Sequence, residues 1–203
     1  MPATPLILAS TSESRRRLLG DAGLSFEIVP PGVDEDEAKR SLAAERAPPQ
    51  DVAEALAELK AVRVSGRHPA ALVIGGDSTL ACNGRLFDKP PTVAAARQQL
   101  LELRGQTHDL ISSVVVAQGG ARIWHHTERG RLTMRPFDEV FLDAYLARAG
   151  DSVTTSVGAY RLESVGAHLF SRVEGDYFTI LGLPLLPLLS FLQSHGIGLD
   201  GAA

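Results

Sequence analysis

The sequence has one cysteine, few aromatic residues and no excess of basic charge. A single cysteine among 203 residues cannot form an internal disulfide, which favours a reducing compartment. A net charge of −4 argues against a general nucleic-acid-binding protein, which normally carries a strong basic excess. No polymeric nucleic acid is therefore expected as a partner. An anionic small molecule needs only a local cluster of cations, so such a ligand is not excluded.

Long apolar runs are also missing. No stretch is apolar over the roughly 20 residues that a membrane-spanning helix requires. The segment after Leu8 is too polar for a signal peptide. We therefore predict a cytoplasmic protein without a membrane partner. The lone cysteine, Cys82, lies in an apolar strand and is expected to be a small core residue rather than a nucleophile.

What the sequence does contain is enough apolar material for a core. With 44% hydrophobic residues, the chain can fold as one domain or as two small lobes around a cleft. Hairpins mixed with helices predict an α/β fold with a mixed, twisted sheet and flanking helices. Strands are expected at 6–9, 26–30, 70–76, 79–82, 85–88, 110–117, 122–133, 158–162 and 168–173, and helices at 12–20, 49–64, 92–104, 137–149 and from Pro184 onward.

Hydroxyl side chains gather at the first strand-to-helix turn, in the segment LILASTSESRRRLL. Ser10-x-x-Glu13 has the form of a capping box. Ser10 and Ser12 are therefore either helix caps or ligands of an anion. Small hydroxyls, backbone N–H groups and fixed cations at such a turn suit a polyphosphate.

Three consecutive arginines begin the helix that follows this turn. Arg15 lies three and four residues before Leu18 and Leu19 and so shares their inward face. Arg16 is next nearest to that face, and Arg17 turns away. A charge run on a helix is often only a solvated surface, but the neighbouring serines favour an anion site.

The central segment VIGGDSTL places Asp77 after two glycines at the end of an apolar strand. Ligands of open α/β sheets bind at such strand ends, and glycines let a ligand approach the backbone. A carboxylate there can hold Mg²⁺ or activate water. The alternative is a turn aspartate that is bonded to its own backbone.

A hairpin signal, Asn83-Gly84, follows the central segment. A two-residue turn at that position pairs Ser78 with Lys89. The lysine is thereby brought within one residue of Asp77. Because side chains alternate between the two faces of a strand, Lys89 would share the face of Ser78, so a bulge or the break at Pro90 must redirect one side chain if Lys89 and Asp77 are to meet.

Two further candidates lie between these segments. Lys60 is at the border of the apolar face of the helix over 49–64, where it either reaches into a cleft or follows the surface into solvent. The segment VDEDEAKR is predicted to be an acidic loop. Its Asp34 and Glu35 are either solvated charges or, with Asp77, ligands of Mg²⁺. The apolar face of the helix is expected to consist of Val52, Ala55, Leu56, Leu59 and Val62.

In this order along the chain, the motifs resemble those of the Maf family of nucleoside triphosphate pyrophosphatases. LILASTSESRRRLL is similar to the serine–arginine motif of that family, and LAELKAV to the helix that carries its lysine. VIGGDSTLACNGRLFDKP resembles its central aspartate and lysine motifs. Further similar segments are FEIVPPGVDE, LRGQTHDLISSVVV and VGAYRLESVGAHLFSRVEGDYFTILGLPL, so the resemblance covers nearly the whole chain and implies a single domain over 1–203.

The resemblance implies a cytoplasmic enzyme that cleaves nucleoside triphosphates, including non-canonical or modified ones, to the monophosphate and pyrophosphate with Mg²⁺ or Mn²⁺. Asp77 would activate water, and Asp77 and Glu35 would hold the metal. Glu35, Lys60 and Lys89 would be the other catalytic groups, and Arg15 would bind phosphate. The implied fold has two lobes around a cleft, is related to the inosine-triphosphatase type, and often forms a homodimer.

Four positions bear on which nucleotide base the enzyme prefers, and they do not point to the same base. Ser14 stands where relatives carry arginine or tryptophan. Ser78 follows Asp77 in the central aspartate motif, where relatives commonly have threonine or glutamine. Ser156 replaces a common lysine. Glu163 matches the branch that favours 7-methylguanosine triphosphate, whereas the thymidine/uridine branch has glutamine. Since a carboxylate can accept two N–H bonds from guanine, we expect a broad enzyme that leans toward guanine or methylated guanine.

Two other functions compete with this interpretation. One is a nucleotide-binding regulator of septum formation with little turnover, which the resemblance also allows if the serines mark a weakened site. The other is a phosphomonoesterase, for which the sequence offers no evident nucleophile.

Overall fold

The structure, a computed structural model, describes residues 4–199 and divides them into two compact units. Unit 1 takes in the chain up to Asp77, residues 112–128 and the chain from Gly182 onward. Unit 2 takes in Ser78–Ile111 and Arg129–Leu181. Over residues 4–199, no helix has the length and apolar character needed to cross a membrane.

The strands form a mixed sheet, which confirms the predicted α/β class. Their order is β2-β1-β3-β5-β6-β7, with β4 paired to β3. β1 runs parallel to β2 and β3, whereas β4 on β3 and β7 on β6 are antiparallel. The strands are β1 (Leu6–Ala9), β2 (Glu27–Ile28), β3 (Leu72–Cys82), β4 (Arg85–Phe87), β5 (Thr107–Gln118), β6 (Ala121–Met134) and β7 (Phe170–Glu174).

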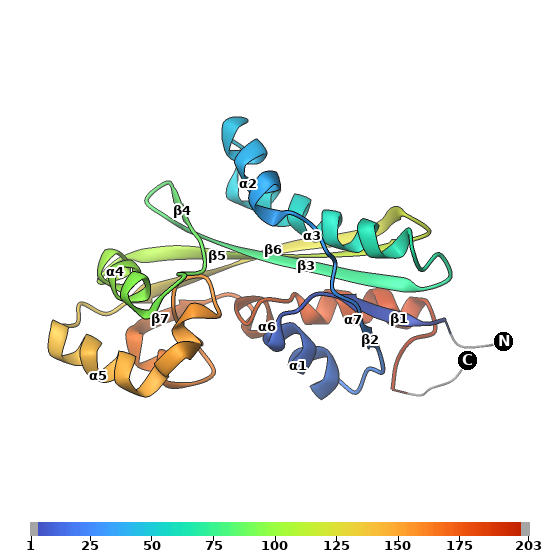
Figure 1. Cartoon of the computed structure of the whole chain (residues 1–203). Coiled ribbons are helices and arrows are strands. Elements are labelled where there is room, and N and C mark those ends of the chain that lie inside the picture. The colour runs from blue at the N-terminus through green and yellow to red at the C-terminus, as the bar shows by residue number, and fades with distance from the viewer. Residues whose placement is uncertain (1–3, 200–203) are drawn as a thin grey trace. The chain divides into compact units, whose positions relative to one another are not determined.

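In unit 1, helices cover both faces of the strands. Figure 1 shows α3 (Pro49–Ser65) along one face, and α1 (Glu13–Asp21) and α7 (Leu185–Ser194) on the other. Two adjacent glycines of β3 mark these faces, because successive strand residues point to opposite sides. A Cβ on Gly75 would lie 2.2 Å from the carbonyl oxygen of Ala57 in α3, and one on Gly76 would lie 2.9 Å from Nε of Arg15 in α1. The backbone of α3 therefore approaches β3 closely, whereas α1 reaches β3 through the side chain of Arg15.

The buried face of α3 differs from the predicted one. Leu59 is 39% exposed, and Ala55 and Val62 are only partly buried. Opposite Gly75 the helix presents Ala57 and Ala61, because the close approach there leaves no room for larger side chains. The buried residues are Val52, Ala53, Leu56, Ala57, Lys60, Ala61, Val64 and Ser65.

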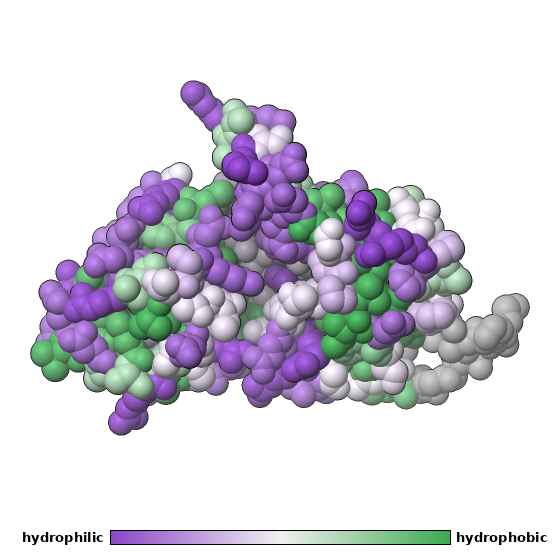
Figure 2. Space-filling model, in the orientation of Figure 1, coloured by the Kyte–Doolittle hydropathy of each residue, from purple (hydrophilic) through white to green (hydrophobic). Residues whose placement is uncertain are grey.

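The predicted acidic loop is a helix, α2 (Glu35–Ala44). The side chain of Asp34 caps it by accepting a hydrogen bond from the N–H of Glu37 at 2.9 Å. Acidic residues in the first turn also suit the positive end of the helix dipole. None of its residues is buried, and the projecting helix at the top of Figure 2 is mostly hydrophilic. Its apolar face is narrow, because only Ala38 and Leu42 among its apolar residues are partly buried, so the charges dominate the sequence pattern.

Unit 2 has its own core, built by two helices against its strands. These are α4 (Val93–Leu103) and α5 (Glu139–Ala149). The same unit contains the short α6 (Tyr177–Ile180) and 3₁₀ turns at Gly150–Thr154 and Val165–Leu169. The cap signals are confirmed, since Thr92 accepts a hydrogen bond from the N–H of Ala95 and Gly105 has φ 71°. The core includes Leu80, Leu100, Leu132, Leu142 and Phe170.

The hairpin at Asn83-Gly84 is confirmed. Both turn residues have positive φ, 51° and 77°, and Cys82 pairs with Arg85. Cys82 is buried as predicted, and burial raises the pKa of its thiol.

Two strand predictions are wrong. β3 runs without a break through Asp77 to Cys82, so Asp77 lies inside a strand rather than at its end. The expected strand over 158–162 is irregular, because Gly158 and Ala159 have φ of 87° and 59° and cannot continue an extended chain.

Gly75→Ala should destabilise the protein by about 1–3 kcal/mol, because the added methyl group overlaps the backbone of α3. The free energy of unfolding from urea titration measures this effect. Gly20→Ala is the matched control, since a Cβ there meets nothing within 4 Å and replaces a helical glycine. It should be neutral or stabilise by roughly 0.5 kcal/mol. Equal effects of the two changes would contradict the close packing of α3 on β3.

Candidate active site

A buried lysine joins two carboxylates in unit 1. Nζ of Lys60 lies 2.7 Å from Oδ1 of Asp77 and 3.0 Å from Oε2 of Glu35. The side chains of Lys60 and Asp77 are 6% and 11% exposed, whereas that of Glu35 is 41% exposed. The structure therefore brings together three of the predicted catalytic residues, from α3, β3 and the first turn of α2. Lys60 reaches inward, and its alternative as a surface lysine is wrong.

The local sequence explains why these groups meet. Asp77 is two residues after Gly75 and so points to the same face of β3, toward α3. Lys60 directly precedes Ala61, one of the two small residues that contact Gly75. Glu35 is the first residue of α2, and the cap by Asp34 holds it there. The packing of β3 on α3 thus places Asp77, and the cap of α2 places Glu35.

Arg15 lies on the other face of β3, over Gly76. Its Nε donates a hydrogen bond to the carbonyl oxygen of Gly182 at 2.9 Å, and Nη1 lies 3.5 Å from Oγ of Ser10. The residue is 8% exposed. Burial lowers the pKa of its guanidinium, whereas the negative charges of Asp77 and Glu35 raise it. Arg15 is therefore a buried cation within the electrostatic reach of both carboxylates.

The two serines at this turn have different roles. Ser12 is the N-cap of α1, where its Oγ accepts the N–H of Arg15 at 3.5 Å. The capping box expected from Ser10 to Glu13 is wrong, because Glu13 is already the first helical residue. Oγ of Ser10 instead accepts the N–H of Ser12 at 3.2 Å and faces Arg15.

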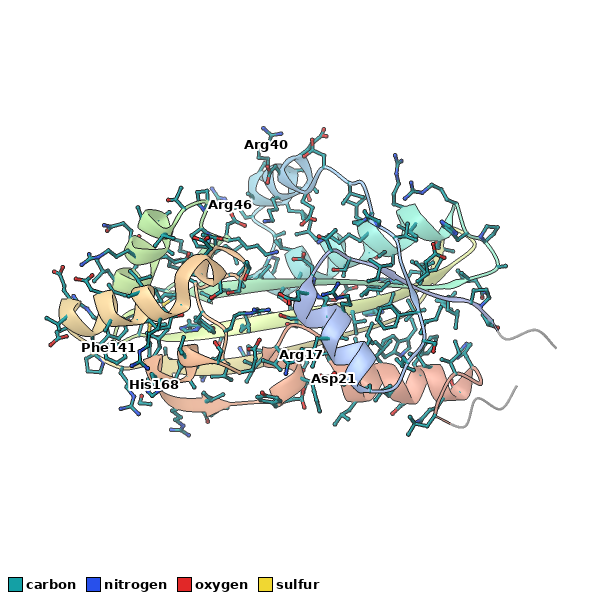
Figure 3. All side chains as sticks on the ribbon, turned by 60° about the horizontal axis from the view of Figure 1, so that its bottom comes forward. Arg17, Asp21, Arg40, Arg46, Phe141 and His168 are labelled. Carbon is teal, nitrogen blue, oxygen red and sulfur yellow. The ribbon has the colours of Figure 1, made fainter. Side chains whose placement is uncertain are left out.

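The other candidate residues on α1 are not buried as Arg15 is. Arg16 is exposed and Ser14 is half-buried. Arg17 turns away as predicted and pairs with Asp21 at 3.4 Å on the outer side of the helix, where Figure 3 labels both.

Three predicted residues belong to unit 2, and their roles stay predictions. Ser78 is half-buried and Lys89 is exposed. The strand pairing between β3 and β4 reaches Leu80 with Phe87 and does not extend to Ser78 and Lys89. Glu163 is half-buried, and its Oε1 lies 3.5 Å from Nε of Arg161.

The loop that carries Glu163 is anchored by buried hydrogen bonds. Nε2 of His108 and the hydroxyl of Tyr160 are 2.8 Å apart, and Tyr145 donates to the carbonyl oxygen of Ala159 at 2.9 Å. Oγ of Ser156 donates to the carbonyl oxygen of Tyr160 at 2.6 Å. Burial lowers the pKa of His108 to about 4, so this histidine is neutral near pH 7. The segment just before Glu163 is therefore anchored by three hydrogen bonds at Ala159 and Tyr160.

Sequence reasoning missed Arg161 and Gly182 as partners of Glu163 and Arg15, and His108 as a partner of Tyr160 in the segment before Glu163. Arg161 had a usable signal, because it lies two positions from Glu163 and carries the opposite charge. His108 and Gly182 had none, since both act on residues that are far away in the sequence.

Glu35 and Asp77 also fit a divalent cation. Their oxygens already converge on one ammonium group, and carboxylate oxygens are the ligands that Mg²⁺ prefers. Residues 4–199 hold no group of three or more histidine, cysteine, aspartate or glutamate side chains arranged for a metal. A cation here would therefore complete its shell with water and phosphate oxygens, as Mg²⁺ commonly does.

Comparisons with known proteins agree on one family. Residues 5–195 match the family model described as "Maf-like protein". The chain is 57% identical to the nucleoside triphosphate pyrophosphatase of Paramagnetospirillum magneticum, over 94% of this chain and 98% of the relative. It is 55% identical to the enzyme of that name from Caulobacter vibrioides, over 97% and 98% of the two chains. The protein with this buried lysine between two carboxylates belongs to the Maf-like protein family.

Proposed function

We propose that this protein is a nucleoside triphosphate pyrophosphatase, which hydrolyses a nucleoside triphosphate to the monophosphate and pyrophosphate. The observation that carries the proposal is the Asp77–Lys60–Glu35 cluster, with the buried Arg15 within its electrostatic reach. The cluster occurs in a chain more than half identical, over nearly its full length, to relatives of that name.

In this reaction, Asp77 is the proton acceptor. It takes a proton from water while the water oxygen bonds to the α-phosphorus and the bond from that phosphorus to the bridging oxygen breaks, so that pyrophosphate leaves. The ammonium of Lys60 fixes one oxygen of Asp77 at 2.7 Å, which orients the other toward the water. Prior orientation of this kind removes much of the entropic cost of attack.

The cations act on the phosphates. Arg15 presents a planar guanidinium, which matches the geometry of phosphate oxygens, and Lys89 adds a second positive group. Such charges stabilise the negative charge that develops on the transferred phosphoryl group, usually the main contribution to catalysis of phosphoryl transfer. Ser10, beside Arg15, would add a hydroxyl donor.

Mg²⁺ or Mn²⁺ is the cofactor that we propose, held by Asp77 and Glu35. When bound, the cation supplies neutralising charge to the phosphate oxygens. With the metal present, Lys60 would keep both carboxylates directed to one point.

We also propose a cytoplasmic location and a homodimer. A single cysteine that is buried suits a reducing compartment. The homodimer rests on the resemblance alone, and analytical ultracentrifugation of the purified chain tests it.

A panel of nucleotides tests the function. The purified chain is incubated with Mg²⁺ and each nucleoside triphosphate, and the products are identified by ion-exchange chromatography. Monophosphate plus pyrophosphate is the expected result. Inorganic phosphate alone would indicate a phosphomonoesterase, and binding without product would indicate a regulatory nucleotide-binding protein.

Glu163→Gln should shift relative kcat/KM from guanine toward pyrimidine triphosphates. The carboxylate accepts two N–H bonds from a guanine edge, whereas an amide matches the mixed donor and acceptor edge of uracil or thymine. Discrimination of this kind amounts to roughly 1–3 kcal/mol, or tenfold to a hundredfold in relative kcat/KM. The same panel measures it.

Glu174→Gln is the control, because Glu174 also belongs to unit 2 and pairs with an arginine, Arg172, at 2.8 Å. It should leave the preference unchanged. A wild-type protein that strongly prefers thymidine or uridine triphosphate, with no change in Glu163→Gln, would refute this role of Glu163.

A further inference from the structure

The guanidinium of Arg15 is held by main-chain groups on two sides. Its Nε donates to the carbonyl oxygen of Gly182 at 2.9 Å, and a residue 167 positions away thereby fixes it. On the side of β3, Gly76 leaves space for the side chain, since a Cβ there would lie 2.9 Å from Nε and 3.1 Å from Cδ. Arg15 therefore lies next to the backbone of Gly76 and Gly182 and is only 8% exposed to solvent.

Gly182 has the backbone conformation that presents its carbonyl group in this position. Its φ is 106°, a value that residues with a Cβ rarely adopt. It directly precedes Leu183, which is fully buried, and α7 starts two residues after that, at Leu185. The carbonyl oxygen is thus carried by a segment that is anchored in the core.

Fixing Nε sets the direction of the whole side-chain terminus. A guanidinium is planar and its N–H donors have a fixed fork geometry, so a hydrogen bond at Nε determines where both terminal nitrogens point. One of these, Nη1, lies 3.5 Å from Oγ of Ser10, at the turn before α1. A lysine at this position would keep the charge but would lack the planar group.

We propose that Gly182 is a positioning residue for phosphate binding, which acts by orienting Arg15 through its carbonyl oxygen. The inference rests on the proposed function, because it takes Arg15 to be a ligand of the substrate phosphates. Gly182 itself touches no substrate. Its contribution lies in the left-handed backbone that aims the carbonyl oxygen at Nε.

Binding of inorganic pyrophosphate tests the proposal without turnover. Gly182→Ala strains the backbone and moves the carbonyl, so the Kd for pyrophosphate, measured by calorimetry, should rise roughly tenfold to a hundredfold. Gly196→Ala is the control, because Gly196 is also in unit 1, has φ 74° and meets nothing within 4 Å at a Cβ. It should show a comparable loss in Tm with an unchanged Kd.

A double-variant cycle separates positioning from general damage. In an Arg15→Lys background there is no Nε donor to orient, so adding Gly182→Ala should leave the Kd for pyrophosphate within about twofold. Additive losses would overturn the proposal, as would an equal rise in Kd for Gly196→Ala.

If Gly182→Ala does not fold, Arg15→Lys alone decides. The lysine keeps the charge without the fixed fork, so it should bind pyrophosphate nearly as weakly as Arg15→Met does. A wild-type Kd for Arg15→Lys would overturn the proposal. Failure of the proposed function gives a different result, namely a folded wild-type protein that releases no pyrophosphate from any nucleotide.

Discussion

Asp77→Asn is expected to lower kcat by about two to four orders of magnitude while the protein remains folded. The amide has nearly the same volume as the carboxylate but cannot accept the proton of the attacking water. Its oxygen can still accept a hydrogen bond from Lys60, which also keeps its contact with Glu35 at 3.0 Å. Initial rates of pyrophosphate release measure the effect, and circular dichroism checks the fold.

Asp36→Asn is the matched control for this change. Asp36 is an exposed carboxylate in the first turn of α2, next to Glu35. Replacing it with asparagine removes one negative charge close to the site, as Asp77→Asn does. Its kcat should stay within about twofold of the wild type, because exposed charges are screened by solvent. Near-normal pyrophosphate release by Asp77→Asn would show that another group accepts the proton.

Local signals in the sequence predicted the parts of the fold that depend on a few neighbouring residues. Asn83-Gly84 forms the predicted hairpin because its left-handed backbone suits these two residue types. Thr92 and Gly105 delimit α4 for similarly local reasons, a side-chain cap and a positive φ. The α/β class followed from such elements taken in order.

Prediction failed where packing between distant segments decides the structure. The periodicity of α3 favoured its large apolar residues, but contact with Gly75 selected the alanine-rich face and took Lys60 into the interior. The helix α2 has only a narrow apolar face, Ala38 and Leu42, within a run of charges, and the cap at Asp34 is its clearest local signal.

The candidate site shows the same division. Motif order pointed to Asp77, Lys60 and Glu35, and the structure joins these three through one ammonium group. The hydrogen bond from Arg15 to Gly182 depends on how the chain returns to the sheet near its end, and no pattern within either segment encodes it.

Lys60→Met should both destabilise the protein and reduce its activity. Removing one member of a buried ion pair leaves its partner as an uncompensated charge, which typically costs about 3–5 kcal/mol. Asp77 is the partner affected most, since its side chain is 11% exposed, whereas the 41% exposed side chain of Glu35 can turn to water. We expect a loss of about 3 kcal/mol in the free energy of unfolding, measured with urea, and a fall in kcat of roughly a hundredfold as Asp77 loses its orientation.

The double variant Lys60→Met with Asp77→Asn distinguishes an uncompensated charge from a simple loss of packing. With asparagine at position 77, no carboxylate is left buried without its cation, so the double variant should be more stable than Lys60→Met alone by at least about 1 kcal/mol. Glu35→Gln serves as the control and should change stability by less than about 1 kcal/mol, because the 41% exposed side chain of Glu35 is solvated and Lys60 keeps its pair with Asp77. If the losses of Lys60→Met and Asp77→Asn simply add, then Lys60 contributes through burial of its aliphatic stem, and the ion pair with Asp77 is not what holds the site together.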